Sequence, residues 1–157
     1  LRLDRRSAEA YVRRGAIYLQ AGDFVRAMGD LDRALELDPD MAEAYNFRGL
    51  ILAGSNRADS AFLEYAKSIE LDPTAVEPYL NRSRLYVVQQ DLDSALADLD
   101  SALAIDRESA ELYLDRAAIH IMAGNTTRAT ADLEQVLSIT QEEGFILAAK
   151  QMLALIR

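Results

Sequence analysis

Apolar side chains recur along the chain with the three-to-four-residue spacing of amphipathic helices. Tyr11, Gly15 and Tyr18 follow the positions i, i+4 and i+7, and a second stripe of the same kind runs from Phe24 to Leu35. Each stripe indicates the buried face of one helix. The two stripes together predict a pair of helices joined by a short turn.

The same pair of stripes returns every 34 residues. Each unit repeats a tyrosine, an arginine, a small residue and an alanine. These columns are Tyr11, Tyr45, Tyr79 and Tyr113; Arg14, Arg48, Arg82 and Arg116; Gly15, Gly49, Ser83 and Ala117; and Ala27, Ala61, Ala95 and Ala129. A fixed period predicts stacked units that cover one another's apolar faces. We expect four units, at residues 8–41, 42–75, 76–109 and 110–143.

Turn-forming residues mark the ends of the predicted helices. Gly22 and Gly124 stand between the two helices of the first and fourth units, where a left-handed backbone ends the first helix. Asn56 and Gln90 take this place in the second and third units, and asparagine adopts that backbone more readily than glutamine. Leu-Asp-Pro closes the first two units because proline cannot continue a helix.

The two ends of the chain depart from the repeat. Residues 1–7 align with the end of a unit's second helix, which predicts the tail of a further unit upstream. Residues 144–157 lack the repeat pattern but carry a single apolar stripe, so we expect a C-terminal capping helix there. The residues from Thr140 to Glu143 have the spacing of a capping box at its start.

Two charged columns invite a chemical interpretation. Each repeated arginine is followed sixteen residues later by an acid, at Asp30, Glu64, Asp98 and Asp132. Matched columns of opposite charge favour ion pairs between helices over an anion-binding ladder. Each unit also carries a glutamate in the first turn of its first helix, at Glu9, Glu43, Glu77 and Glu111. Asp40 and Thr74 lie three residues before two of these glutamates, which favours capping boxes over a metal or acid-base array.

The composition excludes several functional classes. The chain has 157 residues, a net charge of −9, no cysteine and a single histidine. The negative charge disfavours nucleic acid, and the absence of cysteine excludes a thiolate nucleophile. His120 shares an apolar column with Tyr18 and Leu52, so we interpret it as a core or boundary residue. With no phosphate loop, metal motif or long apolar stretch, we expect no enzyme, no cofactor, no metal and no membrane span.

The 34-residue pattern resembles the tetratricopeptide repeat. The first unit matches its signature at Tyr11, Gly15, Tyr18, Gly22, Ala27, Leu31, Ala34 and Pro39. Arginine replaces the leucine that the signature has before the small residue. The resemblance implies an all-α superhelix, a solenoid of four helix-turn-helix repeats plus the capping helix. It also implies that the first helices line a concave surface.

That resemblance places a candidate partner-binding groove on the first helices. Its residues are Arg13, Asn46, Phe47, Leu50, Asn81, Arg84, Val88, Asp115 and Met122. The wider lining is largely apolar, which suits an amphipathic helix or an extended apolar peptide, with Asn46 and Asn81 bonding to its main chain. The alternative is that these residues only cover the inner wall or are buried against an upstream segment.

Some members of the family clamp the acidic tail of heat-shock chaperones with lysine, asparagine and arginine. Val12, Ala16, Phe47 and Glu77 stand at the corresponding positions here, so the clamp is absent. The sequence therefore predicts a protein-interaction scaffold whose protein or peptide partner is of another kind. A targeting or regulatory module of a larger enzyme and a self-associating module, forming a homo-oligomer, remain as alternatives. The cytoplasm is the preferred compartment.

Overall fold

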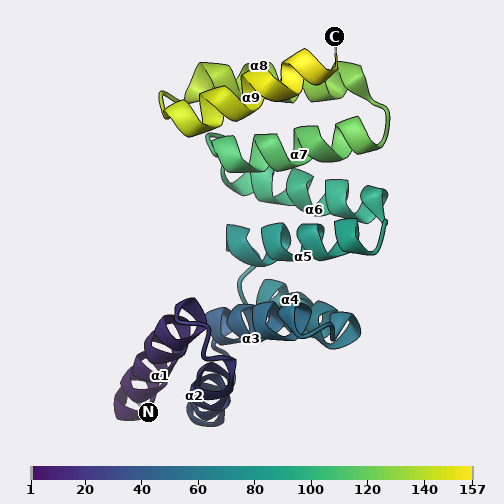
Figure 1. The fold of residues 1–157 in the computed structure, drawn as a ribbon. Coiled ribbons are helices and arrows are strands. Elements are labelled where there is room, and N and C mark those ends of the chain that lie inside the picture. The colour runs from purple at the N-terminus through teal and green to yellow at the C-terminus, as the bar shows by residue number, and fades with distance from the viewer. Residues whose placement is uncertain (1, 157) are drawn as a thin grey trace. The chain divides into compact units, whose positions relative to one another are not determined.

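The computed structural model describes residues 2–156, with side chains from residue 7 onward, and this part of the chain forms nine helices (Figure 1). They are α1 (Arg2–Gln20), α2 (Phe24–Leu37), α3 (Ala42–Gly54), α4 (Ala58–Leu71), α5 (Val76–Val88), α6 (Leu92–Ile105), α7 (Ala110–Met122), α8 (Thr126–Ile139) and α9 (Glu143–Leu155). The described residues contain no strand, as predicted. The helices group into two compact units that meet within α5, between Asn81 and Arg82.

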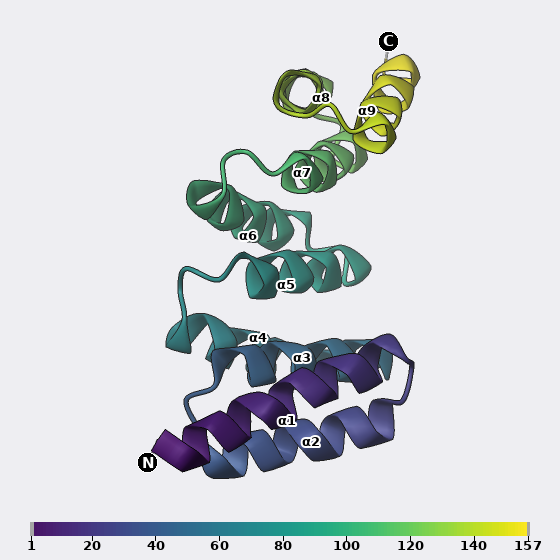
Figure 2. The ribbon, with the colours of Figure 1, turned by 90° about the vertical axis from the view of Figure 1, so that its left-hand side faces the viewer.

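The first unit contains two complete helical hairpins. Helices α1 and α2 lie side by side, as do α3 and α4, and α2 also packs against α3 (Figure 2). A single apolar cluster joins the hairpins, because Leu31 and Leu35 of α2 pack with Ala44 and Ile51 of α3. The apolar stripes of the sequence thus face one shared core.

The second unit contains α6 to α9 and the second half of α5. Helix α6 packs against α7, α7 packs against α8, and α9 packs against both α7 and α8. Leu133 and Val136 of α8 are fully buried in a cluster that includes Ala149, with Phe145 and Met152 of α9 at its edge. Helix α9 therefore places its apolar stripe on the last hairpin.

The turns inside the hairpins have the left-handed backbone that the sequence predicts. The φ angle is 75° at Gly22 and Gly124, 58° at Asn56 and 61° at Gln90. The prediction is thus confirmed at all four positions, including the glutamine, for which this conformation is strained. The four hairpins share one turn geometry although only two of them have glycine.

The expected capping boxes are wrong. Helix α3 begins at Ala42 and α9 at Glu143, and neither has a side-chain hydrogen bond at its N-cap. Thr74 lies two residues before α5, where its hydroxyl donates to the Asp72 carboxylate at 2.7 Å. Asp40 and Thr140 likewise lie before the N-cap residues of their helices, which are Met41 and Glu142.

Aspartates in the turns between hairpins form a local bond of another kind. Asp38, Asp72 and Asp106 each accept a hydrogen bond from the backbone N–H two residues later, at 3.0–3.2 Å. This local bond forms an Asx turn, which directs the chain out of the second helix. Because the third turn has arginine in place of proline, the repeated signal that ends these helices is the aspartate.

The first seven residues do not form a separate element. Residues 2–7 continue without interruption into residues 8–20 of α1. Their assignment to the tail of an upstream repeat stays a prediction, and residue 1 lies outside the described residues. In the described part of the chain, no helix is both long and apolar enough to cross a membrane.

Candidate functional site

The repeated arginines form the ion pairs that the sequence predicts, each between the two helices of one hairpin. Arg14 holds Asp30 through Nε and Nη2 at 2.6 and 2.7 Å. The pairs Arg82 with Asp98 and Arg116 with Asp132 have the same two-pronged geometry. The hydrogen bond from Arg14 lowers the pKa of the Asp30 carboxyl group, although this side chain is buried and burial acts in the opposite direction. This column is therefore structural.

Two of these arginines also contact the hairpin before their own, which the sequence analysis missed. Arg48 Nη1 lies 3.2 Å from Asp32 Oδ1, and Arg116 Nη1 donates to Asp100 Oδ1 at 2.6 Å. Both acids lie sixteen residues before their arginine, so the spacing within the repeat could have predicted these contacts between hairpins. Each guanidinium thus connects two consecutive hairpins.

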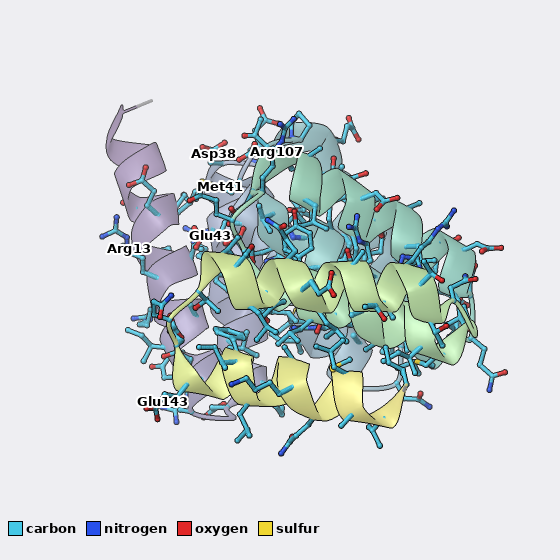
Figure 3. The ribbon with its side chains drawn as sticks, turned by 90° about the horizontal axis from the view of Figure 1, so that it is seen from above. Arg13, Asp38, Met41, Glu43, Arg107 and Glu143 are labelled. Carbon is cyan, nitrogen blue, oxygen red and sulfur yellow. The ribbon has the colours of Figure 1, made fainter. Side chains whose placement is uncertain are left out.

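The candidate groove residues of the first unit lie on three helices. Arg13 is exposed on α1 (Figure 3), Phe47 and Leu50 are partly buried on α3, and the amide of Asn81 on α5 donates to Asn46 Oδ1 at 3.0 Å. Asn46 is only 6% exposed. The two asparagines thus bond to each other, and their bonding to a peptide main chain stays a prediction.

A crevice of about 360 Å³ opens beside Asn46 and Phe47. Glu43, Glu77 and Asp72 contribute carboxylates to its lining, and Glu43 stands in the first turn of α3, just after the turn that contains Asp38 and Met41 (Figure 3). The crevice therefore has an acidic character, which opposes an anionic ligand.

The second unit brings together Arg84, Asp115 and Met122. They line a crevice of about 180 Å³ between α5 and α7, whose remaining lining is Ser83, Val87, Ala118 and Ile119. Met122 is 58% exposed, whereas Val88 is 77% exposed and is not part of this lining. The lining of this crevice is thus mostly apolar, and its charged residues are Arg84 and Asp115.

The charge beside this crevice is internally paired. Arg84 donates to Asp115 Oδ2 at 2.8 Å through Nε and to Glu111 Oε1 at 2.6 Å through Nη2. Glu111, which the sequence assigned to helix capping, thus holds a guanidinium of the neighbouring hairpin. No column indicated this pair, because the positions equivalent to Arg84 are Ala16, Leu50 and Ala118 in the other units.

His120 lies in the core, as predicted, and does not belong to a cluster that could hold a metal ion among the described residues. It is 6% exposed, and its Nδ1 has no hydrogen-bond partner in the described part of the chain. Burial lowers its pKa from 6.5, and the positive charges of Arg116 and Arg128 add to this, against the opposing effect of Asp132 and Asp100.

We expect His120→Leu to remove a loss of stability at mildly acidic pH. Because the pKa of His120 is lower in the folded state, the unfolded chain takes up the proton first, and stability falls as the pH drops below about 6.5. Urea unfolding of both proteins at pH 7.5, 6.5 and 5.5 measures this. The free energy of unfolding should fall more steeply for the parent chain, and parallel curves would contradict the assignment. Leucine is suitable because Leu52 occupies the equivalent buried position.

Family comparisons agree with this geometry. Three models described as tetratricopeptide repeat match residues 8–41, 42–74 and 88–153, which together cover most of the chain. The chain belongs to the tetratricopeptide repeat family, whose repeats generally mediate protein–protein interactions. No curated protein gives a significant match.

Solved structures show the same fold. PilF of Pseudomonas aeruginosa is 21% identical with a TM-score of 0.86, covering 96% of this chain and 69% of that one. MamA is 24% identical with a TM-score of 0.77, covering 90% and 81%. The first tetratricopeptide domain of Spaghetti (RPAP3), solved with the HSP90 peptide SRMEEVD, is 24% identical with a TM-score of 0.68, covering 76% and 92%. The predicted class, an all-α solenoid of tetratricopeptide type, is confirmed.

Proposed function

We propose that this protein is a non-enzymatic scaffold that binds an apolar face of a partner helix or peptide in the crevice between α5 and α7. The observation that supports this most directly is the crevice itself. Met122 is 58% exposed beside Val87, Ala118 and Ile119, so an apolar ligand side chain gains contacts there. Burying the apolar surface of Met122 favours binding.

The ion pairs beside this crevice disfavour an anionic ligand. Arg84 is half exposed and already shared between Glu111 and Asp115, so a ligand anion competes with two fixed carboxylates. A ligand that approaches with apolar side chains leaves these pairs in place and avoids the cost of an unpaired charge. This favours an amphipathic helix over a strongly acidic peptide.

The crevice of the first unit also disfavours a strongly acidic peptide. It is lined by the carboxylates of Glu43, Glu77 and Asp72. The Spaghetti domain was solved with a peptide that ends in Glu-Glu-Val-Asp. Like charges in the crevice of this chain oppose such a sequence, and Val12, at a position of the chaperone clamp, is 1% exposed in the core.

Substitution of Met122 by aspartate should weaken binding in the α5–α7 crevice. A displayed library of amphipathic helical peptides would be selected on the parent chain, and the affinity of the best binder measured by fluorescence anisotropy. We expect Met122→Asp to weaken that affinity by at least about tenfold, because a carboxylate replaces apolar contact surface.

Leu63→Asp is the matched control for this experiment. Leu63 is 73% exposed on α4, far from this crevice along the chain, so the same chemical change should leave the affinity unaltered. Circular dichroism of both variants checks that helical content is kept. A binder that tolerates Met122→Asp would show that the selected site lies elsewhere.

A further inference from the structure

The charged group beside the α5–α7 crevice has more negative than positive charge. Glu111 and Asp115 stand one helical turn apart on α7, and both accept hydrogen bonds from the single guanidinium of Arg84. Like charges at this spacing repel each other, and a cation between them relieves the repulsion. One guanidinium between two carboxylates leaves a surplus of one negative charge beside the apolar lining.

Each of these carboxylates has an oxygen that can accept a further hydrogen bond. Arg84 contacts Oε1 of Glu111 and Oδ2 of Asp115, and the second oxygen of each group has no partner among the described residues. By contrast, Asp98 and Asp132 each give both oxygens to one arginine. The side chains of Glu111 and Asp115 are 49% and 29% exposed, so a ligand can reach them from solvent.

This surplus of charge is not a general feature of the repeat. The positions equivalent to Asp115 in the other units hold Arg13, Phe47 and Asn81, none of which is acidic. The positions equivalent to Arg84 are all apolar. The charged group is therefore additional to the ion pairs that hold the two helices of each hairpin together.

The crevice runs lengthwise along the two helices. Its lining on α7 extends from Asp115 to Met122 with the spacing i, i+3, i+4 and i+7, which is one face of the helix over two turns. At a rise of about 1.5 Å per residue, positions 115 and 122 lie about 10 Å apart along the helix axis. A helical ligand that lies along the crevice spans this distance with seven residues.

We propose that the partner of the α5–α7 crevice is a basic amphipathic helix, with an apolar side chain against Met122 and a lysine or arginine seven positions away that contacts Asp115 and Glu111. This assignment rests on the function proposed above and names the ligand class of the same crevice. The ligand cation donates to the open carboxylate oxygens and leaves the bonds of Arg84 in place. The net charge of −9 on the chain also attracts a basic partner.

A metal ion and a second copy of the chain fit this crevice less well. The described residues contain no group of three or more acidic or histidine side chains that could hold a metal ion. A second copy lacks the required spacing, because none of the large apolar side chains exposed in the described chain has a lysine or arginine seven positions away. The basic helix therefore belongs to a different sequence.

A displayed library of helical peptides tests this ligand class on the full chain. Its members share an apolar anchor and carry lysine, glutamine or glutamate seven positions from it. We expect selection to enrich lysine, and the selected lysine peptide to bind at least about threefold more tightly than its glutamine counterpart in fluorescence anisotropy. This difference should shrink when the salt is raised from about 0.05 to 0.5 M, because the contact is electrostatic.

Asp115→Asn assigns the preference for lysine to this crevice. The substitution keeps the size of the side chain and removes the surplus charge, so the lysine and glutamine peptides should bind about equally. Asp93→Asn is the matched control, since it removes one charge from an exposed position of α6 outside the lining, and it should retain the preference. Circular dichroism of both variants checks that helical content is kept. A preference that Asp115→Asn leaves unchanged would overturn the proposal.

Two further outcomes distinguish the ligand class from the scaffold function itself. A selected peptide that Met122→Asp weakens, but that binds equally with lysine and glutamine, would overturn the basic ligand and leave the scaffold function standing. A selection that yields no peptide sensitive to Met122→Asp would overturn both. Sedimentation of the chain alone is the last readout: self-association that Met122→Asp abolishes would assign the crevice to a second copy and overturn the partner assignment.

Discussion

Gly49→Ala is expected to destabilise the protein by about 2 kcal/mol, although alanine ordinarily stabilises a helix relative to glycine. A Cβ at position 49 would lie 2.5 Å from Cε1 of the Tyr65 ring. Tyr65 is 1% exposed, so the ring has no free space into which to move. Urea unfolding of the parent and the variant measures the difference in free energy.

The double variant Gly49→Ala/Tyr65→Leu tests the cause. Two equivalent pairs combine a larger small residue with leucine, namely Ser83 with Leu99 and Ala117 with Leu133. We therefore expect the double variant to be more stable than the sum of its single variants indicates, by about 1–2 kcal/mol. Additive effects would contradict a direct clash between the two residues.

Gly15→Ala is the matched control in the same column. There the nearest atoms to an added Cβ are those of the Leu31 side chain, at 3.2 Å. This flexible side chain moves aside at a lower cost than a buried ring, and the higher helix propensity of alanine offsets part of that cost. We expect a change within about 1 kcal/mol, clearly smaller than for Gly49→Ala.

Arg116→Met should have the largest effect on stability, a loss of about 3–5 kcal/mol. Arg116 is the partner of Asp132, whose side chain is 7% exposed. Removing the guanidinium leaves a buried carboxylate without its two charge-assisted hydrogen bonds, and such a group is costly in an apolar environment. Chemical unfolding at neutral pH measures the loss.

Removal of both partners should restore most of that stability. Because apolar residues of similar volume replace buried ion pairs at little cost, Arg116→Met/Asp132→Leu is expected to lie within about 1 kcal/mol of the parent. Lys67→Met is the exposed control, since its pair with Glu70 is open to water and salt, and no measurable change is expected. A double variant as unstable as Arg116→Met would show that the pair itself supplies the stability.

The 34-residue period of the sequence was sufficient to predict most of the fold. Helix pairs, their turns and the pairing of Arg14 with Asp30 follow from local spacing, and the structure confirms each of them. The capping boxes failed for a local reason: Asp38 and Asp72 use their carboxylates in the turn, so the helices begin later than the pattern indicates.

Spacing along the sequence predicted only part of the candidate site. A column names the positions on one face of a helix, but it does not say whether two polar side chains there face a ligand or each other. Asn46 and Asn81 pair with each other, and Arg84 reaches Glu111 and Asp115 on the next first helix. These contacts depend on distances between hairpins, which periodicity along one chain does not contain.

The amino-acid order was thus sufficient for the class of fold, the register of its hairpins and the acid that each repeated arginine holds within its hairpin. Those features depend on interactions within one hairpin, where spacing along the chain sets distance in space. The coordinates were needed for the fit of Gly49 against Tyr65 and for the internal pairing at the crevices. Each of these depends on which side chains meet in the folded chain, and identical positions of a repeat have different neighbours.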